Sequence, residues 1–340
     1  MSKLSMQDIA KITNVSRPTV SRVIHSPEKV NAKTRSKVLK AMKQHNYIYD
    51  AVAGELASSK SSVIGMIVPT NSSSIISQVA NAIHDVAGKH NYSIISSNSY
   101  YDSENELNHM TTLMQRRVAG IILVGLSSME EKYLERISKL NVPLVVVWDM
   151  PEHKKISYVA MDGYNGAYTA AKYLLDLGHE RIGFVSGYFN RLDRVQKRYK
   201  GFNDALLERG IRHSPKLFRG KKISMESGME ACDQLLALKN KPTAIMTTSD
   251  TIAMGVMASV RKHHLRIPED ISIIGFDDLE LATYCSPPLT TVRVPSYNLG
   301  KKAANLLFSN IMQKKDIVEK IMANTELVVR KSCGVVKKAG

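Results

Sequence analysis

A short helix is predicted by the stretch Ser16-Arg17-Pro18-Thr19-Val20-Ser21-Arg22-Val23-Ile24 near the N-terminus. Ser16 can act as its N-cap by accepting the backbone N–H of Thr19, and Pro18 falls in the first turn, where its missing N–H costs no hydrogen bond. Apolar residues recur at helical spacing and form an inward face, which leaves the two arginines, Pro18 and Ser21 on the opposite face. A helix N-terminus beside two guanidinium groups suits a polyanion such as DNA.

Two further helices are predicted around this one. The first begins at Ser5, which forms a capping box with Asp8, and it runs to about residue 12. The link between the first and second helices is Thr13-Asn14-Val15, the short turn that a helix-turn-helix needs. A third helix begins near Asn31 and is expected to turn three apolar side chains inward: Val38, Leu39 and Met42. The sequence therefore predicts a small three-helix domain with basic residues outside.

The distribution of charge supports contact between this domain and nucleic acid. Residues 1–60 contain 11 Lys and Arg against 4 Asp and Glu, a net charge of +7. The other 280 residues carry only the remaining +9 of the total of +16. Because the positive charge is concentrated in the N-terminal 60 residues, we predict a nucleic-acid-binding head rather than a uniformly basic surface.

Beyond a polar linker at residues 58–62, short apolar runs alternate with helical patterns. Strands are predicted at residues 63–68, 92–96, 120–124, 144–148, 182–186, 244–247 and 272–276. Helices are predicted from about residue 75 and near 103–116, 129–140, 165–177, 194–209, 226–238 and 251–264, with Ser103 and Glu106 as a capping box. This alternation predicts parallel sheets with helices on both faces, in two doubly wound halves with a ligand site between them.

Other classes of protein are disfavoured. The three cysteines, Cys232, Cys285 and Cys333, lie far apart, and neither a C-x-x-C pair nor histidines at metal-binding spacing occur. Neither a signal peptide pattern nor an apolar run near 18 residues is present, so we expect a cytoplasmic protein without a membrane partner. Because the sequence also lacks a nucleophile–base pattern, a G-x-G-x-x-G and a P-loop, we expect no catalytic residues, metal or cofactor.

Several segments resemble the lactose/galactose repressor (LacI/GalR) family. In the N-terminal region these are Val15-Ser16-x-x-Thr19-Val20-Ser21-Arg22-Val23, Asn31-Ala32-Lys33-Thr34-Arg35, Asn46-Tyr47-Ile48 and Val52-Ala53-x-x-Leu56-Ala57. Further segments follow at residues 117–122, 177–183, 275–278, 288–292 and 327–332, so the resemblance covers essentially the whole chain. It implies a transcription regulator, most simply a repressor, that binds a pseudo-palindromic operator as a homodimer.

The resemblance implies a role for individual residues of the head. Arg17, Pro18 and Arg22 would contact bases in the major groove, with Arg22 the best candidate for a bidentate contact to guanine. Five residues would hold phosphates: Ser16, Thr19, Ser21, Asn31 and Thr34. A hinge helix would fold on DNA and place Ala53, Leu56 and Ala57 at the minor groove. Tyr49, Asp50, Gly54 and Glu55 depart from the family pattern, and the glycine and the two acids predict a weak hinge.

The resemblance also implies the domain organisation. A helix-turn-helix head spans residues 1–48, a hinge and linker 49–61, a core 62–332 and a tail 333–340. The core resembles periplasmic sugar-binding proteins, with one subdomain at about 62–157 and 292–320 and the other at about 162–288 and 324–332. Because few residues follow the last strand and they lack leucine heptads, we expect a dimer without a tetramerising tail.

Six residues are carried over as the effector site between the subdomains: Arg198, Asp277, Ser249, Asp250, Asn71 and Ser73. Arginine and aspartate facing a cleft suit a sugar or polyol, although the additional arginines nearby leave a phosphorylated or acidic ligand open. The effector could also be a corepressor, or a protein partner could replace it. A free sugar-binding protein and a DNA-associated enzyme are the distant alternatives.

Overall fold

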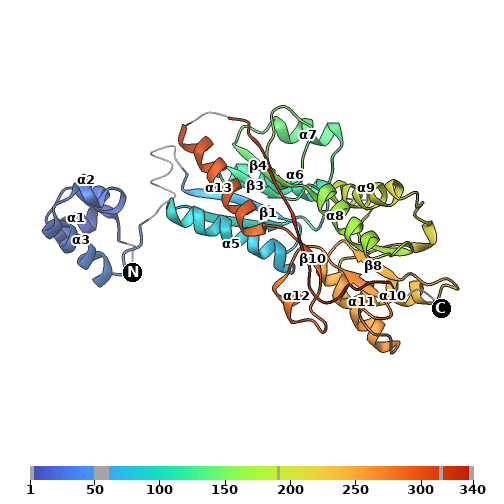
Figure 1. The fold of residues 1–340 in the computed structure, drawn as a ribbon. Coiled ribbons are helices and arrows are strands. Elements are labelled where there is room, and N and C mark those ends of the chain that lie inside the picture. Colours follow the sequence, from blue (N-terminus) through green and yellow to red (C-terminus); the bar gives the residue numbers. More distant parts are fainter. Residues whose placement is uncertain (1–3, 50–60, 190–191, 314–316, 337–340) are drawn as a thin grey trace. The chain divides into compact units, whose positions relative to one another are not determined.

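The computed structural model describes residues 4–49, 61–189, 192–313 and 317–336 (Figure 1). The chain separates into two compact units, Met1–Ser61 and Ser62–Gly340, which we call the N-terminal unit and the C-terminal unit. No helix among the described residues is long and apolar enough to cross a lipid bilayer.

The described residues of the N-terminal unit, 4–49, form three α-helices and one short 3-10 helix. They are α1 (Met6–Thr13), α2 (Arg17–His25), η1 (Pro27–Lys29) and α3 (Ala32–Gln44). The predicted caps are confirmed, since Ser5 and Asp8 form a capping box, and the side chains of Ser16 and Asn31 accept the backbone N–H of Thr19 and of Lys33. Asn14 ends α1 in the left-handed conformation with φ of 47°, which turns the chain into α2.

The core of this unit consists of small and branched apolar side chains: Ile9, Ala10, Val20, Val23 and Val38. The prediction that Leu39 points inward is wrong, because it is 49% exposed. Ala41, three residues after Val38 and therefore on the same face of α3, is buried instead. Met42 is half-buried against the same core.

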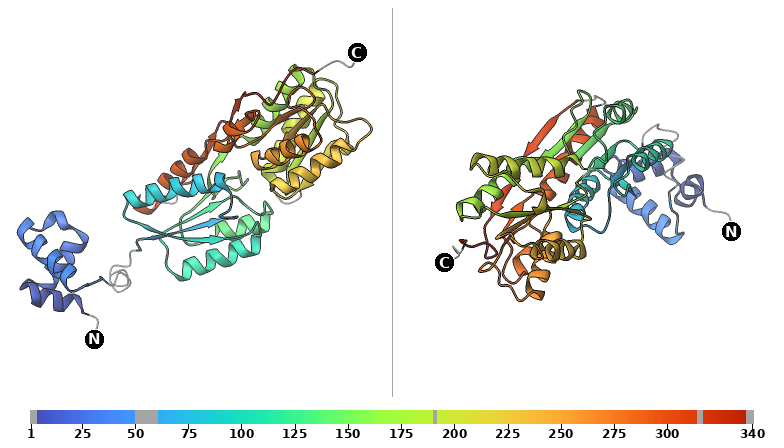
Figure 2. Two further views of the ribbon diagram at one scale, coloured as in Figure 1. Left: turned by 90° about the horizontal axis from the view of Figure 1, so that it is seen from below. Right: turned by 90° about the vertical axis from the view of Figure 1, so that its right-hand side faces the viewer.

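The described residues of the C-terminal unit form two parallel sheets, each covered by helices on both faces, and the predicted fold class is confirmed. In the first lobe, six parallel strands lie in the order β11-β5-β4-β3-β1-β2. Their bounds are β1 (Val63–Val68), β2 (Ser93–Asn98), β3 (Ile121–Val124), β4 (Leu144–Trp148), β5 (Ser157–Met161) and β11 (Lys320–Ala323). Helices α5 (Ser74–Lys89) and α13 (Ser296–Gln313) cover one face, and α6 (Ser103–Gln115) and α7 (Glu131–Ser138) cover the other (Figure 2).

The predicted capping box at the start of α6 is wrong. The N-cap is Asp102, whose carboxylate accepts the backbone N–H of Asn105 at 2.8 Å. Glu106 is instead fully buried, and it accepts hydrogen bonds from the hydroxyls of Ser127 and Tyr133. The N-cap of α6 therefore lies one residue earlier than expected, and Glu106 joins α6 to α7.

The second lobe has four parallel strands in the order β7-β6-β8-β9. They are β6 (Ile182–Gly187), β7 (Phe218–Lys221), β8 (Ala244–Thr247) and β9 (Ser272–Ile274). Helices α8 (Gly163–Asp176) and α9 (Asp193–Glu208) lie on one face, and α10 (Met225–Leu236) and α11 (Asp250–Lys262) lie on the other. Short elements complete this lobe and its connections: η2 (Pro215–Leu217), α12 (Glu280–Tyr284), β10 (Thr291–Arg293) and β12 (Glu326–Val328), the last two antiparallel.

The chain passes between the lobes three times, after β5, before α13 and after β11. The first sheet includes residues up to Met161 and Ala323, slightly beyond the limits of 157 and 320 expected from the sequence. In a parallel sheet, ligand sites form beyond the carboxyl ends of the strands. A ligand site is therefore expected beside the loops that follow the parallel strands of the two sheets.

Candidate functional site

The first candidate surface is the exposed side of α2. The side chains of Arg17, Pro18 and Arg22 are exposed, whereas Val20 and Val23 are buried in the core of the N-terminal unit. Ser16 and Asn31 are exposed at the starts of α2 and α3, and Thr19, Ser21 and Thr34 are half-buried. Among the described residues, no ion pair or side-chain hydrogen bond involves the guanidinium of Arg17 or Arg22, so both keep their donors for an external acceptor. Ala53, Leu56 and Ala57 lie outside the described residues.

The second candidate site is a cavity of about 370 Å³ between the two lobes of the C-terminal unit. It is lined by residues of the loops after β1, β2, β3, β6, β7, β8 and β9, by the last residues of β3 and β4, and by the N-terminal turns of α5, α9 and α11. Its polar side chains include Ser73, Arg194, Arg198, Ser249 and Asp277. This volume lies at the lower end of the range for small-molecule sites, about 300–1,000 Å³.

Arg198 and Asp277 form a buried pair at the wall of this cavity. The Nη2 of Arg198 lies 3.9 Å from Oδ1 of Asp277, and each side chain is less than a tenth exposed. The guanidinium also donates to the carbonyl of Thr248 at 2.6 Å, and it lies over the ring of Phe276 at 3.8 Å from the centroid. Burial lowers the pKa of Arg198 to about 10 and raises the pKa of Asp277 to about 6, although each group opposes the shift of the other.

A second ion pair joins the lobes beside the cavity. Arg194, in the first turn of α9, donates from Nη1 to Oδ2 of Asp149 at 2.7 Å. Asp149 follows β4 in the first lobe, its side chain is 1% exposed, and it also accepts the backbone N–H of Leu126 at 2.6 Å. Asp149 itself is not part of the cavity wall, whereas Arg194 is. The positive charge of Arg194, at the cavity wall, is therefore compensated by a carboxylate that is not itself part of the wall.

The six predicted effector residues divide into two groups. Arg198, Asp277, Ser249 and Ser73 line the cavity, whereas Asn71 and Asp250 do not. Asn71 is exposed on the loop before α5. Asp250 is fully buried, and it accepts hydrogen bonds from the hydroxyl of Thr291 at 2.5 Å and from the backbone N–H of Leu279 at 2.7 Å.

Asp250 therefore stabilises the segments beside Asp277 rather than reaching the cavity. Burial, together with the nearby negative charge of Asp277, raises the pKa of Asp250 to about 8. Gly275 is required next to it, because a Cβ there would lie 2.1 Å from the Asp250 carboxylate.

Four aromatic residues of the cavity wall were missed by the sequence analysis: Tyr100, Tyr101, Trp148 and Tyr188. Tyr101 of the first lobe and Tyr188 of the second lobe meet with ring centroids 4.7 Å apart. All four residues have positive φ, between 50° and 87°, a conformation that non-glycine residues seldom adopt outside functional sites and tight turns. The one available signal was Trp148, the single tryptophan of the chain, at the end of a predicted buried strand.

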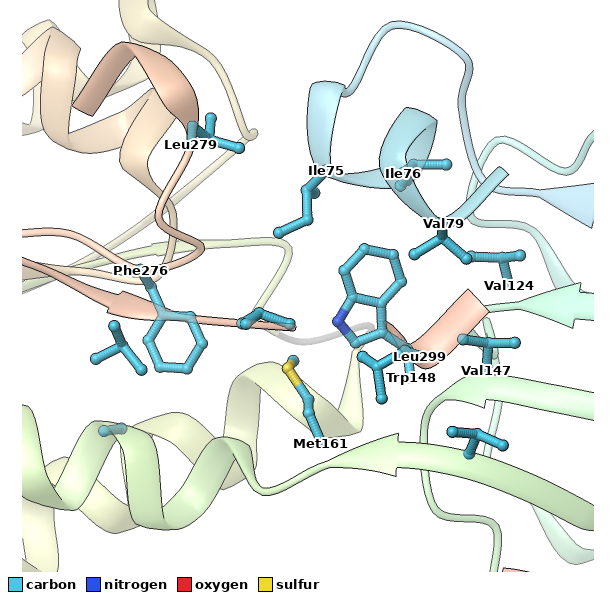
Figure 3. Close-up of a cluster of buried hydrophobic side chains, with 14 of the residues drawn as sticks. Ile75, Ile76, Val79, Val124, Val147, Trp148, Met161, Phe276, Leu279 and Leu299 are labelled. Carbon is cyan, nitrogen blue, oxygen red and sulfur yellow. The ribbon is translucent and has the colours of Figure 1, made fainter. Parts of the chain in front are cut away.

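Apolar side chains hold Trp148 in place. Figure 3 shows its indole between Ile75 of α5 and Met161 at the end of β5, with Val124 and Val147 of the first sheet nearby. Ile75, Val124 and Trp148 belong to the cavity wall as well as to the hydrophobic core. A ligand in the cavity would therefore alter the surroundings of the only indole in the protein.

Comparisons with known proteins agree with both parts of this architecture. Residues 5–50 match the family of bacterial regulatory proteins named lacI, and residues 171–333 match the periplasmic binding protein-like domain. The HTH-type transcriptional repressor PurR of Pasteurella multocida is 33% identical over 328 residues, which cover 96% of this chain and 98% of that repressor. The chain belongs to the LacI family of bacterial regulatory proteins. Catabolite control protein A of Priestia megaterium is 34% identical over 319 residues, 94% of this chain and 96% of that protein.

Solved structures of the LacI family show the same arrangement. The Lac repressor dimer bound to operator and the anti-inducer ONPF superposes with a TM-score of 0.87 at 28% identity, covering 97% of this chain and 99% of that one. A ribose-bound LacI-family regulator from Enterococcus faecium has a TM-score of 0.73 at 27% identity, covering 81% of this chain and all of that one. As a member of this family, the protein is a DNA-binding transcription regulator, and the predictions of a helix-turn-helix regulator and a two-lobed α/β core are confirmed.

Proposed function

We propose that the protein is a dimeric repressor whose operator affinity is controlled by a neutral, polyhydroxylated small molecule, a sugar or a sugar derivative, bound in the cavity between the lobes. The observation that carries this proposal is the pairing of charges: each cavity arginine has a carboxylate partner, Arg198 with Asp277 and Arg194 with Asp149. A cavity with paired charges offers directional donors and acceptors without a net side-chain charge, which suits hydroxyl groups rather than a phosphate.

The remaining wall also fits a sugar. Ser73, Ser249 and Thr248 add polar groups, while Tyr101, Trp148 and Tyr188 supply flat apolar surfaces for the C–H faces of a ring. The ribose-bound relative from Enterococcus faecium supports this ligand class. These features favour a neutral ligand over the acidic one that the sequence left open.

A planar nucleobase is the second candidate ligand. The aromatic rings favour it, because Tyr101 and Tyr188 could separate to sandwich a flat heterocycle while Asp277 accepts a ring N–H. Sugars and nucleobases are readily told apart, since only the latter absorb near 260 nm and stack fully between aromatic rings.

On the DNA side, we infer that Arg17, Pro18 and Arg22 contact bases and that Ser16, Thr19, Ser21, Asn31 and Thr34 contact phosphates. The exposure of both arginines and the concentration of positive charge in the N-terminal residues support this assignment. We infer further that residues 49–61 act as the hinge, with Ala53, Leu56 and Ala57 at the minor groove. A regulator that acts on the chromosome works in the cytoplasm, and we expect no turnover of the ligand.

The experiment that tests the ligand is a thermal-shift screen of neutral sugars, polyols, nucleosides and sugar phosphates, repeated by titration of Trp148 fluorescence. A ligand that binds the folded state stabilises it by about 2.7 kcal/mol at a hundredfold excess over Kd. We expect a shift with a neutral sugar or polyol and its loss in Asp277→Asn. A shift only with sugar phosphates, or one that persists in Asp277→Asn, would contradict the proposal.

A further inference from the structure

The two arginines of the cavity are neutralised in different ways. Arg198 pairs with Asp277, and both side chains belong to the cavity wall. Arg194 also belongs to the wall, but its partner Asp149 lies behind it. The first pair is therefore open to rearrangement by a ligand, whereas the carboxylate of the second pair lies outside the wall of the cavity.

The position of Asp149 is fixed independently of the second lobe. Its Oδ2 accepts the backbone N–H of Leu126 at 2.6 Å, a bond made entirely within the first lobe. The same oxygen receives Nη1 of Arg194 at 2.7 Å across the boundary between the lobes. Asp149 thus presents a carboxylate, held in place by the backbone, to the incoming guanidinium of α9.

The surroundings also leave Arg194 little freedom. Gly125, the residue before Leu126, has φ of +77°, and a Cβ at this position would lie 3.3 Å from Nη1 of Arg194. The guanidinium therefore packs closely against the glycine backbone while it faces the cavity. Its side chain is 15% exposed, so its charge is only partly solvated and depends on the carboxylate.

We propose that Asp149 determines the charge specificity of the cavity: by neutralising Arg194 from behind the wall, it excludes phosphate-bearing ligands and selects neutral ones. The inference rests on the proposed role of the cavity as the effector site. Without the carboxylate, Arg194 is a cation at the wall with free donors, and a guanidinium binds phosphate through charge-assisted, bidentate hydrogen bonds. Removal of one negative charge at this position should therefore convert the cavity into an anion site.

The test is the affinity of the full-length protein for inorganic phosphate at constant ionic strength, measured by calorimetry and by Trp148 fluorescence. In Asp149→Asn the amide oxygen can still accept the Leu126 N–H while the charge is lost. We expect phosphate to bind this variant at least tenfold more tightly than the wild type, which is about 1.4 kcal/mol. The gain should disappear in the double variant Asp149→Asn/Arg194→Gln.

The matched control is Asp176→Asn, which removes the carboxylate partner of the surface residue Arg209 and should leave phosphate affinity unchanged. A folded Asp149→Asn protein that gains no phosphate affinity, or a gain that survives loss of Arg194, would overturn the inference. If Asp149→Asn does not fold, Asp149→Ser carries the same expectation, since it also removes the negative charge beside Arg194. The sugar screen is independent of this result: a wild type that binds no sugar contradicts the proposed ligand, and a missing phosphate gain contradicts the role of Asp149.

Discussion

The arginines of the N-terminal unit and those of the cavity differ in both exposure and partners. Arg17 and Arg22 are exposed on α2, and among the described residues neither guanidinium has a side-chain hydrogen bond or an ion-pair partner. Arg194 and Arg198 have side chains 15% and 7% exposed, and each has a carboxylate within 4 Å. The same residue type thus serves two different purposes within one chain.

The difference follows from what each surface binds. An exposed guanidinium keeps all five donors for an external acceptor and attracts a polyanion at long range. A buried guanidinium must be paired, because an uncompensated buried charge is costly, and its orientation is then fixed by its partner. The N-terminal unit is therefore suited to binding DNA. The cavity is suited to a ligand that is recognised by directional hydrogen bonds rather than by its net charge.

The largest expected difference between the two surfaces is their response to salt. Raising the salt concentration from 50 to 200 mM should weaken operator binding by about a thousandfold or more for a dimer that makes six to ten phosphate contacts. The same change should alter affinity for a neutral cavity ligand less than about twofold, since little net charge is involved. Fluorescence anisotropy with a selected operator and Trp148 titration would measure the two. If the ligand affinity fell with salt as steeply as the operator affinity, the proposed difference between a charge-dependent DNA surface and a cavity without net charge would be wrong.

Loss of a paired arginine should destabilise the C-terminal unit. Arg198→Ala leaves Asp277 buried without its cation, and we expect the free energy of unfolding to fall by about 3–5 kcal/mol. The matched control is Arg209→Ala, which removes an exposed pair with Asp176 and should cost at most about 1 kcal/mol. Urea unfolding followed by Trp148 fluorescence gives both values, and equal costs for the two variants would contradict the difference in pairing.

Loss of an unpaired arginine should instead change recognition without changing stability. Arg22→Ala is expected to weaken operator binding by about 1–3 kcal/mol and to relax base preference at one position of each half-site. Thermal unfolding should be unchanged within about 0.5 kcal/mol, because the side chain is exposed. Selection of binding sites from random DNA with both proteins would show the change, and an unaltered preference would refute the base contact.

The burial of Asp250 in the second lobe predicts that the free energy of unfolding depends on pH. The pKa of Asp250 is raised to about 8, so the folded protein keeps a proton that the unfolded chain loses above about pH 4. The unfolding free energy should therefore fall as pH rises from 5 to 8, by roughly 1 kcal/mol per pH unit from this group. Asp250→Asn should remove this part of the dependence of the unfolding free energy on pH, because an amide does not titrate in this range. The variant should still fold, because the amide can accept the Leu279 N–H and donate to the hydroxyl of Thr291. The same slope in both proteins would show that Asp250 is ionised.

The smallest effect concerns the core of the N-terminal unit. Val38→Ala should destabilise this unit by about 2 kcal/mol, whereas Leu39→Ala should change its stability by less than about 0.5 kcal/mol. Circular dichroism of the thermal transition would compare them. A larger loss for Leu39→Ala would place that side chain in the core after all.

Local patterns predicted most of the fold. Helices α1, α2 and α3 and their caps depend on residues within a few positions of one another, such as Ser16 and Thr19. The long apolar strands and amphipathic helices of the C-terminal unit were equally clear. Asp102 was missed because two adjacent residues can both cap a helix, and the choice depends on the burial of Glu106.

The cavity was only partly predictable, because its geometry depends on contacts between distant residues. Asp250 was assigned to the ligand, but its carboxylate instead accepts a hydrogen bond from Thr291, 41 positions away in the chain. Tyr101 and Tyr188 come into contact only when the two lobes have formed. Their positive φ values cannot be predicted from the spacing of apolar residues in the sequence. The pairing of Arg194 with Asp149 likewise joins two lobes, so the sequence could not separate a neutral ligand from an acidic one.

The most direct test measures operator affinity of the full-length protein with and without a saturating neutral ligand found by the Trp148 screen. The account predicts that the ligand changes operator Kd by about 5–150-fold, the usual range of coupling between two sites. Asp277→Asn should abolish this change while retaining operator binding, and Arg22→Ala should weaken operator binding while retaining ligand binding. A ligand that binds the cavity and leaves the operator Kd unchanged would contradict the central claim that the cavity controls the DNA-binding surface.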